Sequence, residues 1–420
     1  MTLNRRIFLR NSALAMVGVG SAPLWLQRAA YAGEQQNGRK KILVAIFQRG
    51  AADGLNIVVP HGDKAYYDLR PTISVPRPSA NIDPKDSVID LDGHFGLHPA
   101  LANLKPIFDK QQLAIVHAAG SPDPTRSHFD AQDYMESGTP GLKATTDGWL
   151  NRALPPVGGD AKVSPVRAVS LGSSLARTMR GANSAVAVEN LNNFGVKDSA
   201  AAKVLESMYT GTQDQILQGT GRETFDAVSI LQSLNKKPYQ PVPGAEYRGR
   251  FGDSMKQIAQ LIKADVGVEV AFADLGGWDM HVNEVGPKAS VGQLAQRLSE
   301  FGDSLAAFYK DLGDRMEDVV VVTMSEFGRT AKENGTRGTD HGHANAMFVM
   351  GGAVNGGKVL GKWPGLEKHQ LYEERDLALT TDFRDVLGEL VYGHLKNPAI
   401  SSVFPNYKGS KDNFRGVLKA

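Results

Sequence analysis

KILVAIF, residues 41–47, is a continuous apolar run that begins at a lysine and ends shortly before Gly50. A strand that faces water on one side alternates apolar and polar residues, whereas a strand buried on both faces of a parallel sheet is apolar throughout. The run therefore predicts a central strand of a mostly parallel sheet. Runs of the same character occur at residues 113–117, 266–272, 318–323 and 347–350.

Amphipathic helical patterns separate these apolar runs along the chain. They cover residues 99–110, 127–137, 199–208, 222–234, 247–263, 291–311 and 381–393. Strands that alternate with helices are typical of an α/β fold in which helices cover both faces of a mostly parallel sheet. We expect one such domain over residues 33–420.

Each main strand is followed by a glycine-rich, polar loop. These loops lie at residues 48–54, 121–128, 274–281 and 325–329. Ligands of open α/β sheets bind outside the carboxyl ends of the strands. The four loops therefore predict one site to which all of them contribute.

The composition restricts the chemistry of that site. The chain contains no cysteine, so disulfides, thiolate metal sites and a thiol nucleophile are excluded, and a metal must be held by His, Asp, Glu or other oxygen donors. With 47 basic and 45 acidic residues the net charge is +2. This balance gives no support for nucleic-acid binding.

The first 32 residues have the order of a twin-arginine signal peptide. Arg5 and Arg6 are followed by a mildly apolar stretch at 12–26 and by small residues at Ala30 and Ala32. The alternative is an amphipathic helix that happens to contain two arginines. The signal peptide predicts that the twin-arginine translocase exports the folded chain, which becomes periplasmic or secreted without stable membrane insertion.

The sharpest candidate for a metal site combines Asp340, His341 and His343 with Glu326. Two histidines separated by one residue and flanked by carboxylates suit Zn, Mn or Fe. The alternative is a polar loop whose histidines cap helices or bond to the backbone.

Asp279 and His281 form a second carboxylate–histidine pair at the end of the predicted strand 266–272. Alone, the pair would more readily be explained by a hydrogen bond within the loop. At the same sheet edge as His341 and His343, it becomes a plausible second set of metal ligands.

The segment 124–130 opens a predicted helix. Ser127 with Asp130 fits a capping box. The same geometry would also place the hydroxyl of Ser127 or Thr125 as a nucleophile beside Arg126, at a helix N-terminus that attracts anions. His128 is open to three interpretations: a ligand, a base or a surface residue.

These motifs together resemble the twin-arginine-exported family called domain of unknown function 1501 and, more remotely, the alkaline phosphatase superfamily, which includes sulfatases and cofactor-independent phosphoglycerate mutases. The closer match is carried by residues 49–56 (RGAADGLN), 127–133 (SHFDAQD), 276–281 (GGWDMH), 325–330 (SEFGRT) and 340–342 (DHG).

The remote resemblance implies an alkaline-phosphatase-like fold and particular roles for the residues that align with its motifs. It implies metal ligands at Asp53, at Asp279 (or Asp274) with His281, at Glu326, and at His341 or His343, and a nucleophile at Ser127 or Thr125. Phe327 departs from the pattern, because the superfamily has a ligand histidine there. One metal site is therefore expected to be altered or lost.

Two hypotheses follow for the function. The first is an exported hydrolase of a small phosphate or sulfate ester, dependent on a divalent cation (Zn, Mn, Mg or Ca), with Arg126 holding a substrate oxygen. The second is a non-catalytic exported protein that uses the same fold to bind an anionic ligand or a partner protein.

Overall fold

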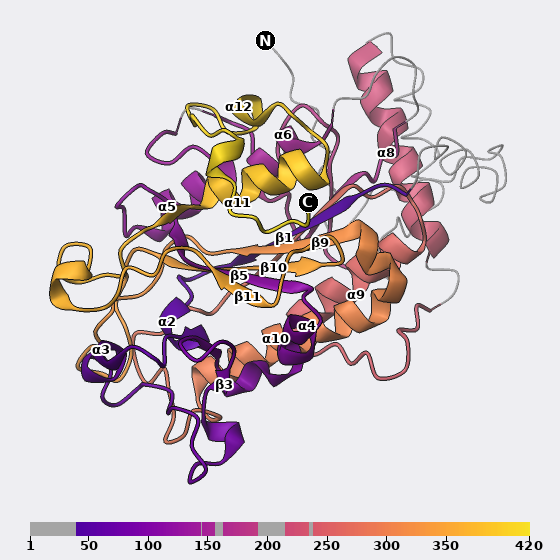
Figure 1. Cartoon of the computed structure of the whole chain (residues 1–420). Helices are drawn as coiled ribbons and strands as arrows, with labels where there is room; N and C mark the ends of the chain where they lie inside the picture. Colours follow the sequence, from indigo (N-terminus) through magenta and orange to yellow (C-terminus); the bar gives the residue numbers. More distant parts are fainter. Residues whose placement is uncertain (1–38, 144, 156–162, 192–214, 235–237) are drawn as a thin grey trace.

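The computed structural model describes residues 39–143, 145–155, 163–191, 215–234 and 238–420 (Figure 1). The expected signal peptide and the helix expected at 199–208 lie outside the described residues.

A nine-stranded sheet forms the centre of the molecule, with strands in the order β11-β5-β10-β9-β1-β8-β6-β7 and β12 paired to β5. In the described chain all pairings of this sheet are parallel except those of β10, which runs antiparallel to β5 and β9. The strands are β1 (Ile42–Gln48), β5 (Leu113–Gly120), β6 (Ala168–Leu171), β7 (Val186–Val188), β8 (Val270–Leu275), β9 (Val319–Met324), β10 (Asn345–Gly351), β11 (Lys358–Leu360) and β12 (Thr381–Asp382).

Strand β1 shows why the sequence forms this sheet. Ile42, Val44 and Ile46 pack into one hydrophobic core, and Leu43 and its alternate neighbours pack into a second core on the opposite face. All seven residues of β1 are buried, because β8 and β9 flank the strand and helices cover both faces. The predicted α/β fold with a mostly parallel sheet is confirmed.

The helices form one layer on each side of the sheet (Figure 1). One core draws on α4 (Lys105–Asp109), α8 (Gln215–Leu234), α9 (Gly249–Lys263) and α10 (Gln293–Leu312). The other draws on α5 (His128–Ser137), α6 (Trp149–Ala153), α11 (Phe383–Glu389) and α12 (Ile400–Val403). The described chain also contains two short helices, α2 (Gly54–Ile57) and α3 (Lys64–Leu69), a small antiparallel sheet of β2 (Val58–Val59), β3 (Ile89–Asp90) and β4 (Gly96–Leu97), and short 3-10 and π-helical turns.

The structure departs from the predicted elements in several places, of which three bear on the sheet. Strand β8 begins at Val270 rather than at residue 266, because Gly267 has a φ of 87° and interrupts the extended chain. The short strands β6 and β7 were not predicted. The segment 381–393 starts as β12 and becomes helical only after Asp382, whose side chain accepts the N–H of Arg384 as an N-cap.

Among the described helices, none is long and apolar enough to cross a lipid bilayer.

The antiparallel direction of β10 determines which loops meet. The carboxyl ends of β1, β5, β8 and β9 lie at one edge of the sheet, and the amino end of β10 reaches the same edge. The segment before Asn345, which contains Asp340, His341 and His343, is therefore brought to the four strand-end loops.

Candidate metal centre

Four side chains from three segments converge at this edge. His128 is the first residue of α5, shortly after β5; Asp279 and His281 follow β8; and His341 precedes β10. His128, Asp279 and His341 form a group whose ligand atoms all lie within 4.8 Å of one another. The Nε2 of His281 adjoins two members of this group, Asp279 and His341.

The ligand atoms of His341 and Asp279 lie at short and similar distances from each other and from those of His128 and His281. The Nε2 of His341 lies 3.1 Å from the Nε2 of His128 and 3.1 Å from that of His281. The Oδ1 of Asp279 lies 2.9 Å from Nε2 of His281, 3.2 Å from that of His341 and 3.5 Å from that of His128. A tetrahedral cation with bonds of about 2.0–2.1 Å has ligand atoms roughly 3.3 Å apart, since the edge is about 1.6 times the bond. The spacings around His341 and Asp279 therefore fit those of metal ligands.

The second nitrogen of each imidazole is held by an oxygen atom. The Nδ1 of His128 lies 2.8 Å from Glu326 Oε1, that of His281 lies 3.2 Å from Asp340 Oδ1, and that of His341 lies 2.9 Å from the Arg126 carbonyl. Carbonyl and carboxylate oxygens accept hydrogen bonds, so we assign the ring proton to Nδ1 in all three cases. The Nε2 atoms of His128 and His281 then both face that of His341, where a cation or a shared proton can lie between them. The oxygen partners match the outer contacts that orient metal-bound histidines.

Asp279 is kept ionised by a buried arginine. Burial would raise the pKa of Asp279, but the Arg329 guanidinium, 2.7 Å away, and the histidines lower it to about 2. The remaining N–H groups of Arg329 donate to backbone carbonyls of Gly50, Ala51, Trp278 and Thr339. Arg329 therefore fixes both the charge and the position of Asp279. The sequence placed Arg329 in a strand-end loop but gave no sign of this role.

Glu326 and Asp340 stand behind the ligand atoms instead of among them. Glu326 Oε1 accepts hydrogen bonds from the Gly50 N–H (2.8 Å), Gln132 (2.8 Å) and His128. Burial acts to raise the pKa of Glu326, but these hydrogen bonds lower it, so the side chain stays a carboxylate. Both residues were expected to be ligands. In the structure Glu326 instead orients His128, and Asp340 orients His281.

Asp53 and His343 lie outside the cluster, although both were expected to be ligands. Asp53 is buried, and its carboxylate receives two N–H groups of the buried Arg70, so a guanidinium supplies its counter-charge. The nearby Glu284 has a pKa well above its usual value because of burial and the Asp53 charge. His343 is turned away: its Nε2 lies 3.1 Å from the Ser121 carbonyl.

The segment before α5 differs from the predicted capping box. Ser127 occupies the N-cap position, but its side chain makes no capping hydrogen bond. The hydroxyl oxygen of Thr125 accepts the Ser127 N–H at 3.2 Å. The Arg126 guanidinium, expected to hold a substrate oxygen, is bound by Asp376 (2.6 Å) and Glu373 (2.7 Å). Arg126 contributes to the centre through its carbonyl.

Access to the centre is one-sided. The side chains of Asp279 and His281 are 46% and 40% exposed. On another side the buried ring of Phe327 packs against His128 and His341, with ring centroids 4.9 Å and 5.0 Å apart. The centre is therefore open to a small molecule next to Asp279 and His281, and apolar where the resemblance has a further ligand histidine.

The protein is thus of the class of α/β proteins that carry a histidine–carboxylate cluster at the carboxyl ends of the strands of their central sheet. The family described as Protein of unknown function (DUF1501) matches residues 40–396, and the chain belongs to this family, as its sequence motifs predicted.

Among solved structures the chain is similar to the PsFucS1 sulfatase from Pseudoalteromonas sp., with 12% identity, a TM-score of 0.35, and coverage of 96% of this chain and 75% of that one. It is also similar to a protein in the alkaline phosphatase superfamily from Vibrio parahaemolyticus, with 8% identity, a TM-score of 0.32, and coverage of 79% and 70%. No curated protein matches the chain.

Proposed function

We propose that this protein is an exported, divalent-metal-dependent hydrolase of a phosphate or sulfate ester. One observation supports the proposal above all others: the Nε2 of His341 and the ionised carboxylate of Asp279 each lie close to the Nε2 atoms of His128 and His281, and the other nitrogen of each of these imidazoles is engaged by an oxygen. His128, Asp279, His281 and His341 would hold the metal.

The ligand set narrows the expected metal. Mg²⁺ and Ca²⁺ prefer sites made of oxygen atoms, whereas imidazole suits Zn, Fe and Mn better. Three nitrogen ligands and one carboxylate therefore favour Zn, Fe or Mn over Mg and Ca. The exposed side at Asp279 and His281 leaves room for a substrate, as catalytic sites require and closed structural sites do not.

The residues of the chain divide the remaining work. A bound cation supplies Lewis-acid activation of the ester group and of the attacking hydroxyl. Ser127 supplies that hydroxyl in our proposal, because it adjoins His128 and its side chain bonds the Asp130 carboxylate instead of capping the helix. Thr125 is less suited, since it lies three residues before His128 and its hydroxyl oxygen accepts the Ser127 N–H. Glu326 and Arg329 hold His128 and Asp279 in place, and Phe327 excludes water from one side.

A second candidate function is favoured by Phe327 and Arg126. Phe327 offers no ligand atom where it packs on His341, and Asp376 and Glu373 neutralise the guanidinium that was expected to bind the ester. Both features suit a non-catalytic exported protein that binds an anionic ligand or a partner protein at the same centre.

Metal content and ester hydrolysis measured on the same preparation test the proposed function. We expect gently purified protein to contain about one equivalent of Zn, Fe or Mn, held by four side chains. It should hydrolyse at least one aryl or alkyl phosphate or sulfate, and a chelator should abolish the activity reversibly. Stoichiometric metal without turnover of any ester would refute the hydrolase and support the non-catalytic binding function. Protein without metal would refute both candidate functions.

Export is part of the proposal and has its own test. The twin-arginine pair is recognised by the translocase, so the processed chain should accumulate in the periplasmic fraction. The double variant Arg5→Lys/Arg6→Lys should retain the precursor in the cytoplasm. Equal export of both forms would contradict this part of the proposal.

A further inference from the structure

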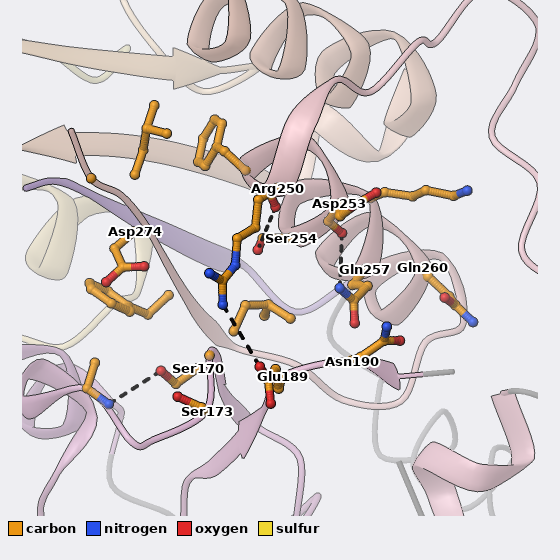
Figure 2. Close-up of a pocket in the computed structure, with 18 of the residues that line it drawn as sticks. Ser170, Ser173, Glu189, Asn190, Arg250, Asp253, Ser254, Gln257, Gln260 and Asp274 are labelled. Carbon is orange, nitrogen blue, oxygen red and sulfur yellow. Dashed lines mark hydrogen bonds and ion pairs between the residues drawn. The ribbon is translucent and has the colours of Figure 1, made fainter. Parts of the chain in front are cut away.

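A second feature of the same sheet edge is a large polar cavity of about 1010 Å³. Its walls are formed by the carboxyl ends of β6, β7 and β8 on one side and by α9 on the other (Figure 2). Ligands of α/β sheets bind at these strand ends, and the cavity is as large as sites that take ligands of several rings.

The charged side chains of the wall largely neutralise one another. Arg49 donates to Asp274 at 2.7 Å, and Arg297 donates to Glu300 at 2.7 Å. Arg250 points across the cavity towards Glu189, 3.9 Å away (Figure 2). The remaining base and acid of the wall, Lys256 and Asp253, both lie on α9 and balance in charge. A charged ligand would have to compete with these internal pairs, so the cavity suits an uncharged one.

The other polar groups of the wall are hydroxyls and amides, which both donate and accept hydrogen bonds. Those labelled in Figure 2 are Ser170, Ser173, Asn190, Ser254, Gln257 and Gln260. Tyr239 also lines the cavity, and its hydroxyl is already bound to Asp311 at 2.7 Å, so it offers an aromatic ring. Groups that donate and accept, together with a ring, match the hydroxyls and apolar faces of a sugar.

The cavity is connected to the candidate metal centre. Arg49 in its wall donates to Gln132 at 3.1 Å, and Gln132 donates to Glu326, which holds His128. Asp274 lines the cavity, and five residues later in the same segment Asp279 belongs to the centre. The wall of the cavity and the candidate metal centre are therefore coupled through one hydrogen-bond chain.

We propose that this cavity binds a neutral, hydroxyl-rich saccharide chain. The extension of this proposal, that the ester cleaved at the metal centre is a phosphate or sulfate carried by that saccharide, rests on the proposed function. Saccharide binding itself requires neither the metal nor turnover.

A glycan microarray tests the proposal, followed by calorimetry with the neutral oligosaccharide that binds best. The wild-type protein, stripped of metal with a chelator, should bind at least one neutral glycan. Ser254→Leu should raise the Kd of that glycan at least tenfold, because it fills the cavity and removes a hydroxyl. Ser173→Leu, on the opposite wall, is a second variant with the same expected result, and circular dichroism verifies that each variant is folded.

The matched control is Ser233→Leu in α8. Ser233 is also a half-buried helical serine, and its hydroxyl donates to a carbonyl of its own helix, as that of Ser254 does, but it lies outside the cavity. The Kd of the Ser233→Leu variant should equal that of the wild type. Failure of every glycan on the array to bind, or a Kd unaffected by both cavity variants, would overturn the proposal.

The outcomes separate this proposal from the proposed function. If the protein binds a glycan but hydrolyses no ester, the saccharide site is supported and the proposed hydrolase function is refuted. If it hydrolyses simple aryl esters but binds no glycan, the hydrolase function is supported and the saccharide site is refuted.

Discussion

His341→Ala is expected to release the metal. His341 has the Nε2 that lies 3.1 Å from both other imidazoles, so its loss opens the middle of the ligand set. Removing an outer-shell partner already costs about 10–100-fold in metal affinity, and removal of a ligand should cost at least that. Plasma emission spectrometry of the dialysed variant should therefore find well under half of the wild-type metal.

Thermal stability should fall together with the metal. A ligand that binds only the folded state stabilises it by about 2.7 kcal/mol when present at a hundredfold excess over Kd. The wild type should gain this stability when metal is added to the stripped protein, and His341→Ala should gain little. The comparison of each protein with and without metal separates the lost ligand from a lost packing contact.

His343→Ala is the matched control, two residues further along the same segment. His343 is buried and bound to the Ser121 carbonyl, so its removal disturbs packing but not the ligand set. It should keep its metal even if it melts at a lower temperature. Equal metal loss in both variants, or full metal in His341→Ala, would contradict the assignment of the centre.

The fold could be predicted from sequence because its decisive signal is local. The continuous apolar run of β1 indicates burial on both faces, and the alternate packing of Ile42 and Leu43 into opposite cores is the direct consequence. The strands β6 and β7 escaped prediction because four and three residues are too few to show a pattern.

The site could be predicted only as far as its location. Glycine-rich loops at strand ends pointed to the correct edge, but the separation of ligands from outer contacts depends on side-chain directions that no spacing determines. Asp53 illustrates the limit, because its partner Arg70 is seventeen residues away and buried beside it. His128 is the opposite case: the sequence left it open as ligand, base or surface residue, and only the approach of α5 to the segment before β10 places it against His341.

Ser127→Ala is expected to abolish ester hydrolysis while the protein keeps its fold and its metal. Loss of a nucleophile removes several orders of magnitude in kcat, up to about 10⁶-fold in well-studied hydrolases. The stability cost should be small, below the roughly 0.5–2 kcal/mol of a lost N-cap, because the Ser127 hydroxyl makes no capping bond. Initial rates on the best ester, with urea unfolding and metal analysis of the same sample, measure all three quantities.

Thr125→Ala is the control, because it removes a neighbouring hydroxyl that only accepts the Ser127 N–H. It should lower kcat by a modest factor through a looser loop. If Thr125→Ala is inactive and Ser127→Ala active, the nucleophile lies two residues upstream of our assignment. If both variants keep wild-type rates, neither hydroxyl attacks, and activated water becomes the nucleophile at the same ligands. Since Asp279 and His281 form the exposed side of the centre, water could reach it there, so this outcome would remove Ser127 from the mechanism and leave the metal centre intact.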